Sequence, residues 1–195
     1  MPGKPSEVPE MLDPAQRLAL AYAPAAARDA WLALFLFDQR LAETARPGRE
    51  PLMIQLRLSW WRDRLGEQSV AWPVSEPVLG QLKAWREQHG PLVKLVDGWE
   101  ALVIAEDGGA ELAQARAEAL EALARLLGVE DLSSTKEAAR QFVDPQTAPT
   151  TVRAIPREMR PLAVLRAMAR REARGGPPTP IRDLVRIMWA GLTGR

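Results

Sequence analysis

The sequence contains no cysteine and only one histidine, His89. The lack of cysteine excludes disulfides, thiolate nucleophiles and cysteine-based zinc sites. A single imidazole excludes a histidine cluster for a metal ion, and the glycine patterns of phosphate-binding loops are also missing. His89 precedes Gly90 at an expected helix end, where an imidazole can bind free backbone carbonyls. Carboxylates are therefore the main catalytic candidates.

Long apolar runs are missing as well. The longest, Ala30–Phe37, has eight residues, whereas a membrane-spanning helix needs about 20. The N-terminal segment MPGKPSEVPE has no apolar stretch of the kind found in signal peptides. These absences predict a cytoplasmic protein that can at most lie at the surface of a membrane.

The formal net charge of +1 conceals a strong asymmetry along the chain. Residues 97–144 hold eleven acidic and four basic residues, whereas residues 152–195 hold ten Arg, no Lys and three acids. Three explanations remain open: the two segments pack on each other, the basic end binds an anionic partner, or both are solvated faces of opposite sign.

The pattern of apolar residues is helical almost throughout. We expect residues 1–12 to be disordered and residues 13–195 to form one helical domain, with a Pro/Thr connector at 144–156, a basic helix at 157–173 and a terminal helix at 180–193. The sequence thus predicts an all-α, single-domain bundle of about eight or nine helices.

Proline, glycine and capping residues predict the helix ends. Two helices have both ends predicted, from Pro24 to about Arg46 and from Pro51 to Gly66. Four more have a predicted start, namely at Pro14 after the cap Asp13, after the cap Ser75, at Pro91, and at a capping box of Ser134 and Glu137. One further helix is expected to end at Gly128. In the helix after Pro51, we expect the core-facing stripe to contain Leu52, Leu56, Trp60, Trp61 and Leu65.

Acidic pairs at helical spacing are the candidates for a metal site. Mg²⁺ prefers oxygen ligands in octahedral geometry, which favours acids three or four residues apart. Asp38 and Glu43 are five apart, about 140° around a helix, and do not share a face. Better spaced pairs are Asp97/Glu100, Glu118/Glu121 and Asp107/Glu111. Each pair is also explained as a solvated helix face.

The basic helix is amphipathic. Its apolar side holds Leu162, Leu165, Met168 and Ala169, and the other side forms a basic surface of Arg160, Arg166, Arg170, Arg171 and Arg174. The planar guanidinium group suits phosphate oxygens. Anionic lipid headgroups, a nucleic-acid backbone and the acidic middle of the chain are possible targets. Nucleic acid is the weakest of them, because no aromatic residues alternate with these arginines.

Three segments carry a family resemblance: ALAYAPAAARDAWLALFLFDQRLAE, EPLMIQLRLSWWRDRL and LVKLVDGWEALV. Together with IPREMRPLAVLRAMARRE, they resemble the squalene/phytoene synthase family, over residues 13–105 well and over 156–173 weakly. The resemblance implies an isoprenoid-synthase-like but truncated helical fold. The family's enzymes condense isoprenoid diphosphates head to head, with Mg²⁺ held by aspartate motifs.

The first aspartate motif of the family is degenerate here. The alignment implied by the resemblance places Ala42 and Glu43 at the paired acids and Arg46 at the last acid, after Asp38. A cation at that place would repel Mg²⁺, and no second motif of the Asp-x-x-x-Asp type is present. The resemblance leaves a possible diphosphate or ligand contact at Arg57, Trp60, Trp61 and Arg62.

We therefore expect a non-catalytic protein that acts by binding, without a cofactor. The resemblance extends to a branch of the family that includes a mitochondrial complex I assembly factor, which implies an assembly or chaperone role at a membrane-associated complex. The first alternative is an Mg²⁺-dependent prenyl-diphosphate transferase that uses Glu43 with Arg57 and Arg62. The second is an isoprenoid- or lipid-binding module without chemistry.

Overall fold

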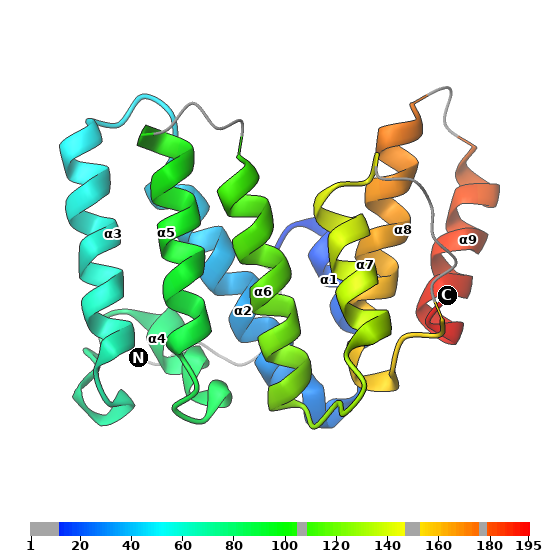
Figure 1. Cartoon of the computed structure of the whole chain (residues 1–195), viewed down its shortest axis with the longest axis horizontal. Coiled ribbons are helices and arrows are strands. Elements are labelled where there is room, and N and C mark those ends of the chain that lie inside the picture. The colour runs from blue at the N-terminus through cyan, green and yellow to red at the C-terminus, as the bar shows by residue number, and fades with distance from the viewer. Residues whose placement is uncertain (1–11, 105–108, 147–152, 176–178) are drawn as a thin grey trace. The chain divides into compact units, whose positions relative to one another are not determined.

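The computed structural model describes residues 12–104, 109–146, 153–175 and 179–195 (Figure 1). Over these residues it holds nine α-helices and no strand, so the all-α prediction is confirmed. The helices are α1 (Pro14–Ala21), α2 (Ala25–Thr44), α3 (Pro51–Gly66), α4 (Pro77–Leu82), α5 (Gly90–Ile104), α6 (Ala110–Leu126), α7 (Ser133–Val143), α8 (Arg160–Arg174) and α9 (Pro180–Thr193), with short 3-10 turns η2 (Ser69–Ala71), η3 (Lys83–Trp85) and η4 (Arg157–Met159).

The contacts of the chain divide it into two compact units. Unit 1 comprises residues 1–28 and 123–195, and unit 2 comprises residues 29–122. The boundaries fall inside α2 and α6. The expectation of a single domain from 13 to 195 stays a prediction. Of the segment expected to be disordered, residues 1–11 lie outside the described residues, as do residues 147–152 of the Pro/Thr connector.

Unit 2 is built around buried tryptophans, with α3 packed on α5. Trp31, Trp61 and Trp85 are fully buried. The Trp61 ring meets Phe37 edge to face, with 5.3 Å between ring centroids, and the Trp85 indole N–H donates to the Ala30 carbonyl at 3.1 Å. Large aromatic rings give this unit its core, although the buried Trp61 indole N–H has no hydrogen-bond partner.

In unit 1, α8 packs against α1, α7 and α9 (Figure 1). Its first half, from Pro161 to Arg166, is buried on all sides because three helices surround it. Gly191 of α9 faces the Tyr22 ring so closely that a Cβ would collide with it. The Ile155 N–H donates to the Gly194 carbonyl at 2.8 Å. These contacts fix the end of α9 against the rest of the unit.

Most predicted helix ends are confirmed, and two capping predictions are wrong. The Asp13 carboxylate accepts the Gln16 N–H at 2.9 Å and caps α1, and α3 has the expected bounds. Glu76, not Ser75, precedes α4. Ser134 lies inside α7 and is buried, so the capping box does not form.

The predicted buried face of α3 is only partly right. Leu52 and Leu56 are 57% and 58% exposed. The buried residues of α3 are instead Ile54, Leu58, Trp61 and Leu65. These four follow a spacing of four, three and four, which is an equally good helical stripe.

Among the described residues, no helix combines the length and apolar character that crossing a membrane requires.

Candidate functional site

Asp38, one of the positions expected to be a remnant of a metal-binding motif, bonds to two other helices of unit 2. It accepts the Trp99 indole N–H at 2.8 Å and the Arg116 Nε–H at 3.0 Å. The Arg116 guanidinium also lies over the Trp99 ring, 5.1 Å from its centroid. Both carboxylate oxygens of Asp38 therefore have donors, and the residue joins α2, α5 and α6.

Glu43 belongs to a second ion-pair cluster. Arg40 donates to Glu43 at 3.2 Å and to Glu76 at 2.9 Å. Arg57 donates to the same oxygen of Glu76 at 3.3 Å. Glu76 is only 6% exposed, and its hydrogen bond is the main cause that raises the pKa of Arg40. The Glu43 carboxylate and the Asp38 carboxylate thus bind different arginines.

The donor set does not fit the Mg²⁺ site that the resemblance implies. Ala42 offers no ligand, Arg46 is exposed and cationic, and the two remaining acids are bound to arginines. Mg²⁺ would have to displace a guanidinium from each of them. In the described parts of the chain, no three acids or histidines gather closely enough to hold a metal ion.

Acids of two other pairs are also bound to cations. Asp97 accepts from Arg62 at 2.6 Å, and Glu100 binds the same guanidinium. Glu118 accepts from Lys94 at 2.6 Å. Of the remaining pair, Asp107 lies outside the described residues. These ion pairs link α3 with α5 and α5 with α6 at the surface of unit 2, where such pairs add little to stability.

Of the expected ligand contacts, Trp61 is fully buried in the core of unit 2, and its contact with a ligand stays a prediction. Trp60 is half-buried and lies beneath two guanidinium groups, Arg57 at 5.0 Å and Arg64 at 5.9 Å from its ring centroid. Arg57 and Arg62 are engaged by the acids named above.

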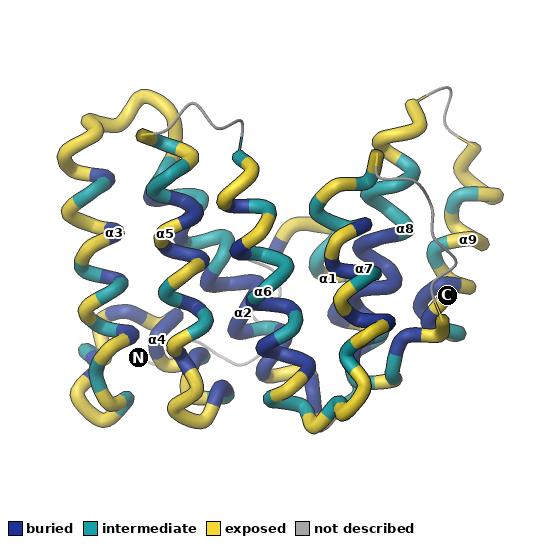
Figure 2. The backbone as a smooth tube through the Cα atoms, in the orientation of Figure 1, coloured by how far each residue is buried: buried dark blue, intermediate teal, exposed yellow. Residues whose placement is uncertain are grey.

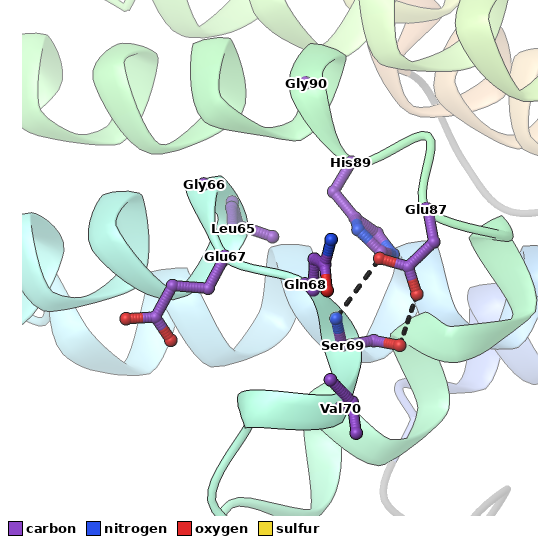
Figure 3. Close-up of a pocket in the computed structure, with 9 residues that line it drawn as sticks. All are labelled: Leu65, Gly66, Glu67, Gln68, Ser69, Val70, Glu87, His89 and Gly90. Atoms are coloured by element: carbon purple, nitrogen blue, oxygen red, sulfur yellow. Dashed lines mark hydrogen bonds between the residues drawn. The ribbon is translucent and has the colours of Figure 1, made fainter.

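Unit 2 has a pocket of about 510 Å³ between the end of α3 and the start of α5. Figure 3 shows Ser69 and Glu87 facing each other in it, with the Ser69 N–H and hydroxyl both donating to the Glu87 carboxylate. These hydrogen bonds lower the pKa of Glu87. Arg86 and Glu87 have φ values of 50° and 61°, a left-handed conformation that costs energy in residues other than glycine.

His89 does not act as a base for Ser69. Its Nε2 lies 3.0 Å from the Leu82 carbonyl, and the residue is 2% exposed. His89 therefore binds a carbonyl at a helix end, as expected, but that end is Leu82 of α4. The helix end expected beside His89 itself is wrong, because His89 directly precedes the start of α5. Ser69 has a carboxylate partner but no imidazole, so the pocket lacks the arrangement that activates a hydroxyl nucleophile.

The five arginines expected on one basic surface have different surroundings. Arg166 is 6% exposed, so its assignment to the surface is wrong. Arg171 donates to Asp183 of α9 at 2.7 Å. Arg160 is half-buried, Arg170 is half-buried and Arg174 is exposed. Arg166 lies four residues after Leu162, about 40° around the helix, which places it at the edge of the buried side.

A second pocket of about 510 Å³ lies between α8 and α9 in unit 1. Three arginines of α8 and two of the C-terminal segment line it, together with the indole of Trp189: Arg166, Arg170, Arg174, Arg186 and Arg195. No acidic side chain is among its lining residues. The sequence-based prediction missed Arg186, Trp189 and Arg195.

Much of α9 is exposed (Figure 2), and its exposed side is apolar. Six large side chains on it are between 43% and 81% exposed: Ile181, Leu184, Val185, Met188, Trp189 and Leu192. Their spacing of three, one, three, one and three residues forms one stripe about 140° wide. Arg182 and Arg186 follow one border of this stripe. The stripe spacing is visible in the sequence, but its exposure is not.

Two arrangements thus remain as candidates, the pocket beside Ser69 and the α8–α9 face. Only the α8–α9 face combines exposed apolar area with arginines that outnumber nearby acids. Monomeric proteins rarely expose an apolar face of this kind without a binding partner. Comparison with known proteins gives no match: no family model, no curated protein and no solved structure is similar to the chain.

Proposed function

We propose that this chain is a non-catalytic protein that acts by binding, and that it docks on an anionic membrane surface through α9. On the resemblance of residues 13–105, the proposal includes a distant relation to the squalene/phytoene synthase family. It also includes an assembly or chaperone role at a membrane-associated complex. The observation that carries the docking proposal is the exposed apolar stripe of α9, bordered by arginines.

The chemistry of an amphipathic helix at a bilayer matches α9. Such a helix lies in the plane of the interface, with its apolar side chains below the headgroups and its cations beside the lipid phosphates. Burying six half-exposed side chains offers on the order of 5 kcal/mol, and each arginine near an anionic surface adds about 1 kcal/mol. The sum is sufficient for reversible attachment of a peripheral protein.

The ion pairs of unit 2 support the non-catalytic part of the proposal. Ionisation of an allylic diphosphate needs metal ions or fixed cations that stabilise the leaving group. Here the acids Asp38 and Glu43 accept hydrogen bonds from arginines. The cations Arg57 and Arg62 in turn donate to other carboxylates. The alternative of a prenyl-diphosphate transferase would require these pairs to open. Calorimetric titration with farnesyl diphosphate tests it, and Mg²⁺-dependent binding lost in Glu43→Ala would revive it.

The docking proposal is tested by co-sedimentation with phosphatidylglycerol-containing vesicles. The variant carries Ile181→Ser, Leu184→Ser and Leu192→Ser, three exposed positions outside the arginine pocket. A matched control carries Leu52→Ser, Met53→Ser and Leu56→Ser on α3, which are exposed to a similar degree. We expect the α9 variant to lose at least tenfold in vesicle binding and the α3 control to keep it.

Two further measurements check that vesicle binding depends on the arginines and that the variants are folded. Binding of the unchanged protein should weaken as salt rises, because the arginine contribution is screened. Circular dichroism should show the same helix content in all three proteins, since the substituted side chains contact little of the core. Equal vesicle binding of both triple variants would refute docking through α9.

A further inference from the structure

The side chains that line the pocket between α8 and α9 have an excess of positive charge. Five arginines line it, and no acidic side chain does. Like charges gathered in one place repel each other, and burial with the nearby Arg170 guanidinium lowers the pKa of Arg166. A surface that only needed to be solvated would spread these charges apart.

Arg166 is the most unusual of the five. It is 6% exposed, and its buried Nη1 has no hydrogen-bond partner. Glu137 is the acid whose charge reaches it, but the two Glu137 oxygens accept from Arg140 and Gln141, each at 2.7 Å. A buried charged donor without an acceptor costs about 1–3 kcal/mol or more. The fold therefore holds a guanidinium in place at a cost that an anionic ligand would offset.

The shape of the pocket narrows the class of ligand. Guanidinium groups bind phosphate oxygens through two parallel hydrogen bonds, and several arginines around one pocket favour a group with two negative charges. The volume of about 510 Å³ exceeds the needs of a bare ion and lies in the range of small-molecule sites. Val185 and Trp189 add an apolar rim on the α9 side, where the organic part of a ligand can lie.

We propose that this pocket binds a phosphomonoester, with its phosphate at Arg166, Arg170 and Arg174 and its organic part against Trp189. The same group occurs in a phosphatidic-acid headgroup and in soluble phosphate esters. Binding of the phosphatidic-acid headgroup rests on the proposed docking through α9, whereas binding of a soluble phosphate ester does not. The two sources are separated by the experiments below.

The first experiment measures the thermal unfolding of the protein with phenyl phosphate, against sodium chloride of equal ionic strength. Phenyl phosphate should raise the Tm of the unchanged protein by about 3–6 °C. Arg166→Met, and separately the double variant Arg170→Met with Arg174→Met, should lose this shift. Arg157→Met is the matched control, because Arg157 is an exposed arginine of the same unit that does not line the pocket.

Two further measurements identify how the group is recognised. Arg166→Lys keeps the charge but loses the planar fork, so calorimetry should show a dissociation constant at least tenfold larger. The second proton of a phosphomonoester leaves near pH 6. Affinity should therefore rise as the pH passes from about 5 to 7, which simple attraction of a monoanion would not produce.

The lipid source is tested with vesicles that contain equal fractions of either phosphatidic acid or phosphatidylglycerol. If the lipid is the ligand, phosphatidic acid should be preferred by the unchanged protein and by Arg157→Met, and Arg166→Met should abolish the preference. If Arg166→Met loses the preference for phosphatidic acid but still binds phosphatidylglycerol vesicles, the pocket has lost its ligand while docking through α9 is unaffected. An equal Tm shift in all variants, or neither a shift nor a lipid preference in the unchanged protein, would overturn the proposal.

Discussion

In unit 2 three arginines donate to acids, whereas in unit 1 the buried Nη1 of Arg166 has no acceptor. Arg40 and Arg57 share the buried Glu76, and Arg116 binds Asp38. Arg166 is more deeply buried than any of these three and has an unbonded Nη1. Removal of a charge should therefore have opposite consequences for stability in the two places.

The difference separates charges that hold the fold from charges that remain available for a ligand. A matched pair in a protein interior loses stability when one member is removed, because the other is left uncompensated. An unmatched buried cation already carries that penalty in the folded protein. Asp38 and Glu43 belong to the first kind, whereas Arg166 on the α8–α9 face belongs to the second.

The largest effect is expected at Glu76. Glu76→Ala removes a 6% exposed carboxylate that binds two arginines, and should lower the free energy of unfolding by about 2 kcal/mol, less than for a fully buried pair because both arginines are partly solvated. Urea denaturation measures the change. Glu50→Ala, at an exposed acid of the same unit, should change stability by less than about 0.5 kcal/mol. Equal losses in the two variants would contradict the comparison.

A smaller loss is expected at Asp38. Asp38→Ala leaves the Trp99 indole N–H and the Arg116 guanidinium without their acceptor, at a cost of about 1–2 kcal/mol. A double-mutant cycle with Arg116→Met isolates the pair, and should give a coupling energy of about 0.5–1 kcal/mol. If Asp38→Ala instead increased stability, the carboxylate would be strained in the folded protein, as expected for a working metal ligand rather than a structural one.

The helix ends could be predicted because their causes are local. Asp13 caps α1 from the adjacent turn, and Pro51 begins α3 because its missing N–H is not needed there. The buried face of α3 could not be predicted in the same way. The row with Leu52 and Leu56 and the row with Ile54 and Leu58 are equally apolar, and only the packing of α3 on α5 decides between them.

The candidate site was only partly predictable for the same reason. Arg166, Arg170 and Arg174 were expected to bind phosphate groups, and all three line one pocket. The partners from α9 were missed, because no local pattern places Arg186 or Trp189 beside α8. The burial of Arg166 follows from the helices around α8, whereas its position about 40° from Leu162 was already present in the sequence.

Removal of the Arg166 charge is expected to change stability in the opposite direction from removal of Glu76 or Asp38. Arg166→Met replaces an unmatched buried cation with an apolar side chain of similar length, and should leave stability unchanged or raise it by about 1 kcal/mol in the absence of ligand. Urea denaturation in phosphate-free buffer is the appropriate measurement, because a bound anion would stabilise only the unchanged protein. A loss of more than about 1 kcal/mol would mean that Arg166 is matched within the fold.

The finest test compares two arginines of the same helix. Arg171 donates to Asp183 at 2.7 Å, and this bond is the main cause that lowers the pKa of Asp183. A carboxyl group with a lowered folded-state pKa stabilises the fold above its unfolded pKa near 3.9, and the contribution disappears as the pH falls through the folded-state pKa. Asp183→Asn should therefore lower the Tm by about 1–2 °C at neutral pH. The difference from the unchanged protein should vanish in acid, whereas Arg166→Met should show no such dependence. The two arginines would then be distinguished on α8 itself, since Arg171 donates to an acid of the protein and the buried Nη1 of Arg166 does not.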